Sequence, residues 1–105
     1  MTDLNAAEVL ERAADLIEPV GAWTQDMYRV PGKDCFCAVG AVGMVLGKGK
    51  WIGGRAAEDF VDANSKLFGM DASDLEEWND TPGRTQAEVV AALRQAAALA
   101  REQGK

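Results

Sequence analysis

The stretch from Cys35 to Leu46 constrains the fold more than any other part of this chain, because it is apolar on every side of a helix. A helix that is hydrophobic all round is typical of a buried element. Gly40 and Gly43 lie inside this stretch, where glycine costs about 1 kcal/mol relative to alanine. Close approach of another backbone along the bare face would compensate for that cost. We therefore expect a buried central helix over residues 35–46, capped by Asp34.

Helix-start signals place further helices around this element. Three residue pairs have the spacing of a capping box, namely Asn5/Glu8, Ser73/Glu76 and Thr85/Glu88. Apolar residues recur at helical spacing after the first and last pairs and again over residues 55–68, whereas residues 22–33 predict a loop or a minimal hairpin arm. The predicted fold is all-α: one compact domain over residues 1–105. It has four main helices, with residues 35–46 at the centre, and a short helix over residues 73–78.

Composition excludes several classes of function. The chain contains no histidine, which rules out Ser-His-Asp and Cys-His catalysis and histidine metal sites. The net charge of −6 argues against general affinity for nucleic acid or an anionic membrane. No apolar stretch approaches the roughly 20 residues of a membrane span, and the N-terminus does not resemble a signal peptide. We expect a cytoplasmic protein without cofactor or metal, in which Cys35 and Cys37 are reduced thiols.

Cys37 is the one candidate catalytic residue. In the first turn of the central helix, the helix dipole would lower the pKa of its thiol and favour the nucleophilic thiolate. A general base normally accompanies such a nucleophile, and without histidine only Asp, Glu or Lys can serve. We expect a small, buried structural residue, with a thiol-dependent enzyme as the alternative. Cys35 and Cys37 without a second cysteine pair do not make a zinc site.

The loop leading into the 55–68 helix is the candidate binding segment. Glycine-rich backbone that enters a helix N-terminus can present free amides to an anion. The loop does not end in Gly-Lys-Ser/Thr, so it is not a P-loop. The predicted binding residues are Lys48, Lys50, Trp51 and Arg55. A protein contact centred on Trp51, a nucleotide or small-anion site, and a plain connector with its tryptophan tucked into the core all stay open.

Charge is distributed unevenly along the chain. Residues 57–80 hold eight acidic residues and one basic residue, whereas residues 29–55 hold five basic residues and one acidic residue. We expect the acidic face to be solvated and to lie opposite the Trp51 loop. Tryptophan and arginine are enriched in interface hot spots, so a specific contact is expected to centre on Trp51.

The segment Trp78-Asn79-Asp80-Thr81-Pro82-Gly83-Arg84-Thr85 predicts a structural turn that docks the last helix. Asn and Asp side chains bond nearby backbone amides in such turns. Arg84 lies four residues after Asp80 and is placed to clamp it, and Thr85 is the expected cap of the last helix. The alternative is a polar site in which the asparagine and aspartate lie beside Cys37, which requires the two motifs to meet in space.

Two motifs together carry a resemblance to a known family. They are Cys37-Ala38-Val39-Gly40-Ala41 and the Trp78–Thr85 segment, which a Glu-Val-Val-x-x-Leu helix follows. Gly21-Ala22-Trp23-Thr24-Gln25 fits the same pattern. From Ala7 to Ala97, the chain resembles a family of small actinobacterial and actinophage proteins classed as a domain of unknown function, although Cys35 departs from the pattern. The resemblance implies a phage or actinobacterial source and no particular activity.

Small size, acidity and the lack of catalytic groups favour a non-enzymatic binding protein. Together with the resemblance, they suggest a phage-type accessory protein that engages a host protein in the host cytoplasm. A nucleotide or small-anion binder that uses residues 47–55, and a thiol-dependent enzyme that uses Cys37, are the alternatives.

Overall fold

Six helical segments build the part of the chain that the computed structural model describes, residues 4–105. They are α1 (Ala6–Ile17), α2 (Ala38–Leu46), α3 (Gly54–Ala63), α4 (Ser65–Phe68), α5 (Ala72–Asp80) and α6 (Gln86–Glu102). The only sheet-like pairing in these residues is two isolated bridges, which join Phe36 to Trp23 and to Arg29. The predicted all-α class is therefore confirmed. None of the helices in residues 4–105 has the length and apolarity needed to cross a membrane.

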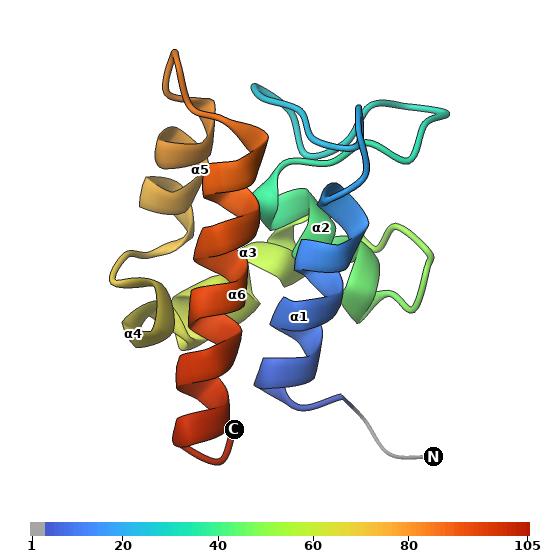
Figure 1. Cartoon of the computed structure of the whole chain (residues 1–105). Helices are drawn as coiled ribbons and strands as arrows, with labels where there is room; N and C mark the ends of the chain where they lie inside the picture. The colour runs from blue at the N-terminus through green and yellow to red at the C-terminus, as the bar shows by residue number, and fades with distance from the viewer. Residues whose placement is uncertain (1–3) are drawn as a thin grey trace.

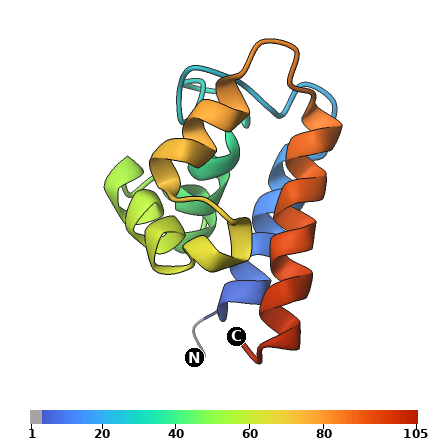
Figure 2. The same ribbon diagram turned by 90° about the vertical axis from the view of Figure 1, so that its left-hand side faces the viewer.

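The helices pack around one hydrophobic core. Figures 1 and 2 show α1 and α6 side by side and antiparallel, with α2 against α1 and the shorter helices beyond it. α2 contacts α1, α3 and α5, so it occupies the centre. The large side chains buried in this core include Leu10, Ile17, Val39, Val42 and Leu93.

The central helix is buried as predicted, but it begins three residues later than expected. Residues 35–37 are extended because their backbone pairs with the preceding loop: the Phe36 amide donates to the Ala22 carbonyl at 2.9 Å, and the Cys37 amide donates to the Tyr28 carbonyl at 3.0 Å. The N-cap is consequently Cys37 and not Asp34. The Cys37 Sγ accepts a hydrogen bond from the Gly40 amide at 3.3 Å.

Gly40 makes the close backbone contact that its position predicts. A Cβ at this residue would lie 1.8 Å from the carbonyl oxygen of Tyr28. Gly43 faces side chains instead, those of Trp51 and Ala57. The irregular segment 22–33 is therefore seated directly on the bare face of α2 at Tyr28.

The helix predicted over residues 55–68 is interrupted. At the break, the side-chain amide of Asn64 donates to the Phe60 carbonyl at 2.8 Å, and this competes with continuation of the helical hydrogen bonds. The segment therefore divides into α3 and α4. The capping boxes predicted at Asn5 and Thr85 both form and begin α1 and α6.

The short helix α5 is longer than predicted at both ends. Its N-cap is Asp71 and not Ser73, because the Asp71 carboxylate accepts from the backbone amide three residues later, at 2.9 Å. It ends at Asp80 instead of near residue 78. Asn79 and Asp80 therefore belong to the last turn of a helix that packs on α2.

Candidate functional site

The cysteine motif of α2 and the Trp78–Thr85 segment meet at Asn79, which is completely buried. The Asn79 Oδ1 accepts from the backbone amide of Ala38, the first residue of α2, at 3.1 Å. The same atom accepts from the indole Nε1 of Trp23 at 2.8 Å, and the Asn79 Nδ2 donates to the Thr24 carbonyl at 3.1 Å. One side chain thus joins α5, the start of α2 and the preceding loop. The sequence left open whether the cysteine motif and the Trp78–Thr85 segment meet in space, and the structure shows that they do.

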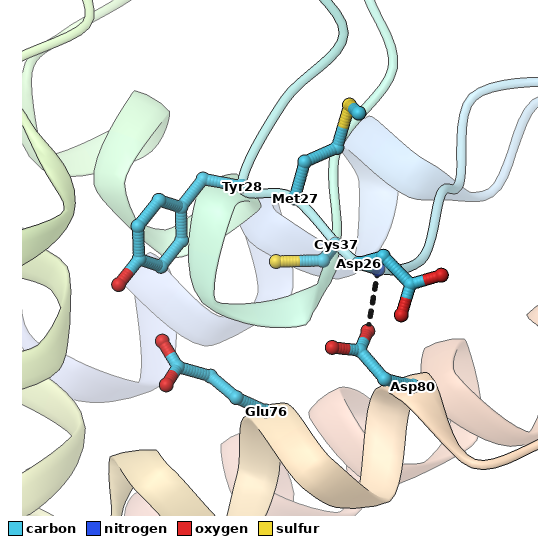
Figure 3. A pocket seen from close by; sticks show the side chains of 6 residues that line it. All are labelled: Asp26, Met27, Tyr28, Cys37, Glu76 and Asp80. Atoms are coloured by element: carbon cyan, nitrogen blue, oxygen red, sulfur yellow. Dashed lines mark hydrogen bonds between the residues drawn. The ribbon is translucent and has the colours of Figure 1, made fainter.

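A small pocket lies next to this junction. It has a volume of about 220 Å³, and Figure 3 shows the six side chains that line it: Asp26, Met27, Tyr28, Cys37, Glu76 and Asp80. Sites for drug-sized ligands usually enclose roughly 300–1,000 Å³, so this pocket suits a single functional group. Within residues 4–105, no group of three or more cysteine or acidic side chains is arranged to hold a metal ion.

Asp80 fixes one wall of the pocket. Its Oδ1 accepts from the Asp26 backbone amide at 2.8 Å, the dashed line in Figure 3, and from the Asn79 Nδ2 at 3.0 Å. Asp26 has a φ of 68°, a left-handed conformation that aspartate adopts more readily than most residues. The bond to Asp80 holds this conformation and so places the next two residues, Met27 and Tyr28, at the pocket.

Tyr28 and Glu76 face each other across the pocket, and Figure 3 shows the phenol hydroxyl directed at the carboxylate. Burial raises the pKa of Glu76, as does the carboxylate of Glu58, whereas the Tyr28 hydroxyl partly offsets the shift. Burial and the same two carboxylates raise the pKa of Tyr28, so its hydroxyl keeps its proton. The Glu76 Oε2 is buried and has no hydrogen-bond partner within residues 4–105.

Cys37 does not have the features of an activated nucleophile. Burial raises the pKa of its thiol to about 11, and the backbone amides of Gly40 and Val39 offset this only in part. The lowering expected from the helix dipole is therefore outweighed by desolvation. At neutral pH the side chain is a protonated thiol that caps α2, and the thiolate required for cysteine nucleophiles is scarce.

Arg84 does not clamp Asp80, contrary to the prediction. Its Nε donates to the Trp78 carbonyl at 2.9 Å, and its Nη1 pairs with Glu88 at 3.1 Å. The centre of its guanidinium lies 4.2 Å from the centroid of the Trp78 ring, within the range of a cation–π contact. Thr85 caps α6 as predicted. Arg84, Trp78 and Thr85 therefore tie α5 to α6 and do not reach the pocket.

The predicted anion-binding loop does not present all of its amides outward. The backbone amides of Lys48, Gly49 and Lys50 donate to the carbonyls of Val45, Met44 and Gly47, respectively. These bonds close the end of α2, so these three amides are already satisfied by the chain itself. The side chains of Lys48 and Lys50 are exposed.

Arg55 and Trp51 have different surroundings in the structure. Arg55 shares a groove with four acidic residues, namely Glu58, Asp59 and Asp62 of α3 and Asp71, the N-cap of α5. It is therefore not opposite the acidic face, as expected, but beside part of it. Trp51 is half-buried against Gly43, so it is neither free in solvent nor enclosed in the core.

Trp51 does not line the pocket, but it lies close to Tyr28, which does. The centroids of the two rings are 5.9 Å apart, and the guanidinium of Arg29 lies 5.6 Å from the centroid of the Trp51 ring. Tyr28 therefore lines the pocket and also lies beside Trp51. The loop residue Trp51 and the cysteine motif, which the sequence presented as separate candidates, are thus linked through one side chain.

Comparison with known proteins then identifies the family. A family model described as a family of unknown function (DUF6197) matches residues 1–99. The chain belongs to this family. The match confirms the resemblance to an uncharacterised family, and all the pocket residues of this DUF6197 chain lie inside the matched range. No match was found among curated proteins or among solved structures.

Sequence reasoning missed most of the pocket of this DUF6197 chain. Asp26, Met27 and Tyr28 lie in a segment without periodicity, and Glu76 was interpreted as part of a capping box. The one signal that pointed to Tyr28 was the bare face at Gly40, which predicted a close neighbour without saying which residue it would be.

Proposed function

We propose that the chain is a non-enzymatic binding protein that engages a partner protein through the Tyr28 surface. This surface consists of the pocket together with Tyr28, Met27, Trp51 and Ile52. The observation that carries the proposal is the position of Tyr28. This residue lines the pocket, and the centroid of its ring lies 5.9 Å from the centroid of the Trp51 ring. An aromatic pair beside a small acidic pocket provides both an anchor and a polar recognition element.

The composition of the Tyr28 surface supports a protein contact. Tyrosine, tryptophan, methionine and arginine are enriched at protein interfaces. Met27 and Ile52 are 49% and 52% exposed, and they directly neighbour Tyr28 and Trp51 in the chain. Arg29, whose guanidinium packs over Trp51, adds a charged edge. The apolar side chains give affinity, and the charged groups select the orientation of the partner.

The chemistry of Cys37 favours binding over catalysis. Its thiol is buried and has a pKa of about 11, so the residue serves as a helix cap. In this proposal the chain is a phage-type accessory protein of actinobacterial or actinophage origin. It engages a host protein in the host cytoplasm. The motif resemblance supports this origin, and the Tyr28 surface supports the mode of contact.

Capture from an actinobacterial lysate tests the proposal. The wild-type chain, Trp51→Ala and Val20→Ala are immobilised, and retained proteins are quantified by mass spectrometry. Val20 is the matched control because it is a fully exposed apolar residue outside the Tyr28 surface. Circular dichroism first establishes that both variants fold. Each retained protein is then purified and titrated against the three chains by calorimetry.

The proposal expects a partner that binds the wild type and Val20→Ala equally. Loss of a hot-spot tryptophan costs about 2 kcal/mol or more, so Trp51→Ala should weaken this partner by about 30-fold. The proposal is wrong if no protein binds the chain, or if every protein that binds retains its affinity for Trp51→Ala.

A further inference from the structure

We propose that the carboxyl groups of Glu58 and Glu76 share one proton beside the Tyr28 hydroxyl, and that loss of this proton releases the Tyr28 ring from α3. The Tyr28 surface then has its described form only while the proton is bound. The consequence for partner binding rests on the proposed function, whereas the shared proton and the release of the ring concern the chain alone.

The first argument is the seating of the Tyr28 ring on the beginning of α3. A Cβ at Gly54, the first residue of that helix, would lie 2.5 Å from the Tyr28 Cε2 and 2.6 Å from its Cζ. Glu58 follows Gly54 by four residues, and residues four apart lie on the same face of a helix. Glu58 therefore lies on the face of α3 that the ring covers, while Glu76 of α5 faces the same hydroxyl (Figure 3).

The second argument is the Glu76 Oε2, which is buried and has no hydrogen-bond partner within residues 4–105. Buried polar atoms in proteins are rarely left unpaired. A carboxylate oxygen can only accept, but a protonated one also donates. Glu58 and Tyr28 both act on the ionisation of Glu76, so their oxygens lie close to it. A proton on Glu76 turns the unpaired acceptor into a donor to one of these oxygens, and no ligand is needed.

The third argument is the charge around Glu76. The titratable groups that face it come from the loop before α2 and from α2, α3 and α5, namely Asp26, Tyr28, Cys37, Glu58 and Asp80. No lysine or arginine lines the pocket. Arg55 shares the neighbouring groove with Glu58, but it forms no ion pair among residues 4–105. Burial, together with the charges of Glu58 and Asp80, raises the pKa of Glu76 and so favours the bound proton.

Release of the ring follows from what remains after the proton passes to water. Two carboxylates then face each other, one on α3 and one on α5, and like charges this close repel one another. The phenol has a single proton to donate and cannot pair both of them. The Tyr28 backbone stays in place, because its carbonyl accepts the Cys37 amide at 3.0 Å and lies against Gly40. The side chain therefore moves while the loop stays on α2, and Trp51 loses its aromatic neighbour.

NMR of the full ¹³C-labelled chain between about pH 4 and about pH 9 tests the proposal. Carboxyl carbon shifts report the titration of Glu76, and the NOE between the Tyr28 ring and the Gly54 α-protons reports whether the ring stays on α3. The variants are Glu58→Gln and Glu76→Gln, which keep side-chain shape and remove one carboxyl group each. Glu77→Gln is the matched control, because Glu77 is an exposed acid of α5 outside the pocket. Backbone spectra show whether each variant is folded.

The shared proton predicts that Glu76 titrates above the ordinary glutamate pKa of about 4.3. Glu58→Gln should move this titration to lower pH, because a like charge has been removed, whereas Glu77→Gln should move it little. A titration of Glu76 at the ordinary pKa, or an equal response to Glu58→Gln and Glu77→Gln, overturns the shared proton.

Release of the ring predicts that the NOE between Tyr28 and Gly54 is lost with the same midpoint as the titration of Glu76. In Glu76→Gln, which cannot ionise, the NOE should persist over the whole range. An NOE that persists while Glu76 loses its proton, or that is lost equally in Glu76→Gln, overturns the switch. Because both readouts come from the chain alone, these outcomes do not depend on whether a partner protein exists.

Discussion

Replacing Gly40 with alanine tests how tightly the loop that forms the pocket is seated on the central helix. The added Cβ would lie 1.8 Å from the Tyr28 carbonyl oxygen and 2.6 Å from its carbonyl carbon. Both distances fall below the 3.0 Å that real Cβ contacts essentially never undercut. The atoms concerned are backbone, so no rotamer change can relieve the clash. The Tyr28 carbonyl must move, although it accepts the Cys37 amide at 3.0 Å.

Two opposing terms decide the magnitude for Gly40→Ala. Alanine in a helix interior gains about 1 kcal/mol over glycine. Overpacking costs about 1–3 kcal/mol or more, and weakening the Tyr28–Cys37 hydrogen bond adds about 1 kcal/mol. The net destabilisation is therefore about 1–3 kcal/mol. For a domain of this size, that lowers the melting temperature by roughly 5–20 °C.

Thermal unfolding followed by circular dichroism measures this effect, with Gly43→Ala as the matched control. Gly43 lies in the same helix, and alanine there gains the same propensity. Its Cβ would lie 3.0 Å from the Trp51 Cζ3 and 3.2 Å from the Ala57 Cβ, so it requires shifts of only a few tenths of an ångström, by the tryptophan ring and by the helix that carries Ala57. We expect Gly43→Ala to melt close to the wild type. If Gly40→Ala melts at or above the wild-type temperature, the close seating of Tyr28 is wrong.

Three further predictions concern the junction and the pocket. Asn79→Ala should lower the free energy of unfolding, measured in urea, by about 3 kcal/mol or more, because the Trp23 indole and the Ala38 amide both lose a buried acceptor. A decrease well below 1 kcal/mol would contradict the role of Asn79 in joining α5 to α2. Glu76→Gln should raise the melting temperature at neutral pH. Burial raises the pKa of Glu76 in the folded state, so its protonated form is the stabilising one and that stability is lost as pH rises through the folded pKa. The advantage of Glu76→Gln should therefore shrink toward the ordinary glutamate pKa of about 4.3, and an advantage that grows in acid would refute this sign. In a Cys35→Ser background, Cys37 should react with a thiol reagent slowly in the native protein and rapidly once unfolded, since burial raises its pKa to about 11; rapid native labelling would restore the enzyme hypothesis.

The helices that the sequence predicted well are those whose signals are local. The caps at Asn5 and Thr85 depend on residues three positions apart, and each formed as expected. The burial of α2 depends on its own apolar residues. The misplaced boundaries have a different origin. Residues 35–37 stay extended because they pair with loop residues between 5 and 14 positions earlier in the chain, and no local pattern contains that information.

The candidate site was predictable in its parts and not in its assembly. Cys37 and Asp80 were each singled out, but their approach depends on Asn79, whose bond to Ala38 joins residues 41 positions apart. Tyr28 was missed because the segment around it has no helical or strand period. Its position is set by the bare surface of Gly40 and by the Asp26–Asp80 bond, and both are tertiary contacts.

Calorimetric titration of a captured partner against the wild-type chain, Trp51→Ala and Val20→Ala tests the central claim most directly. The account predicts that Trp51→Ala binds the partner about 30-fold more weakly than the wild type does, and that Val20→Ala binds it like the wild type. Equal affinity of all three chains for the partner would contradict it.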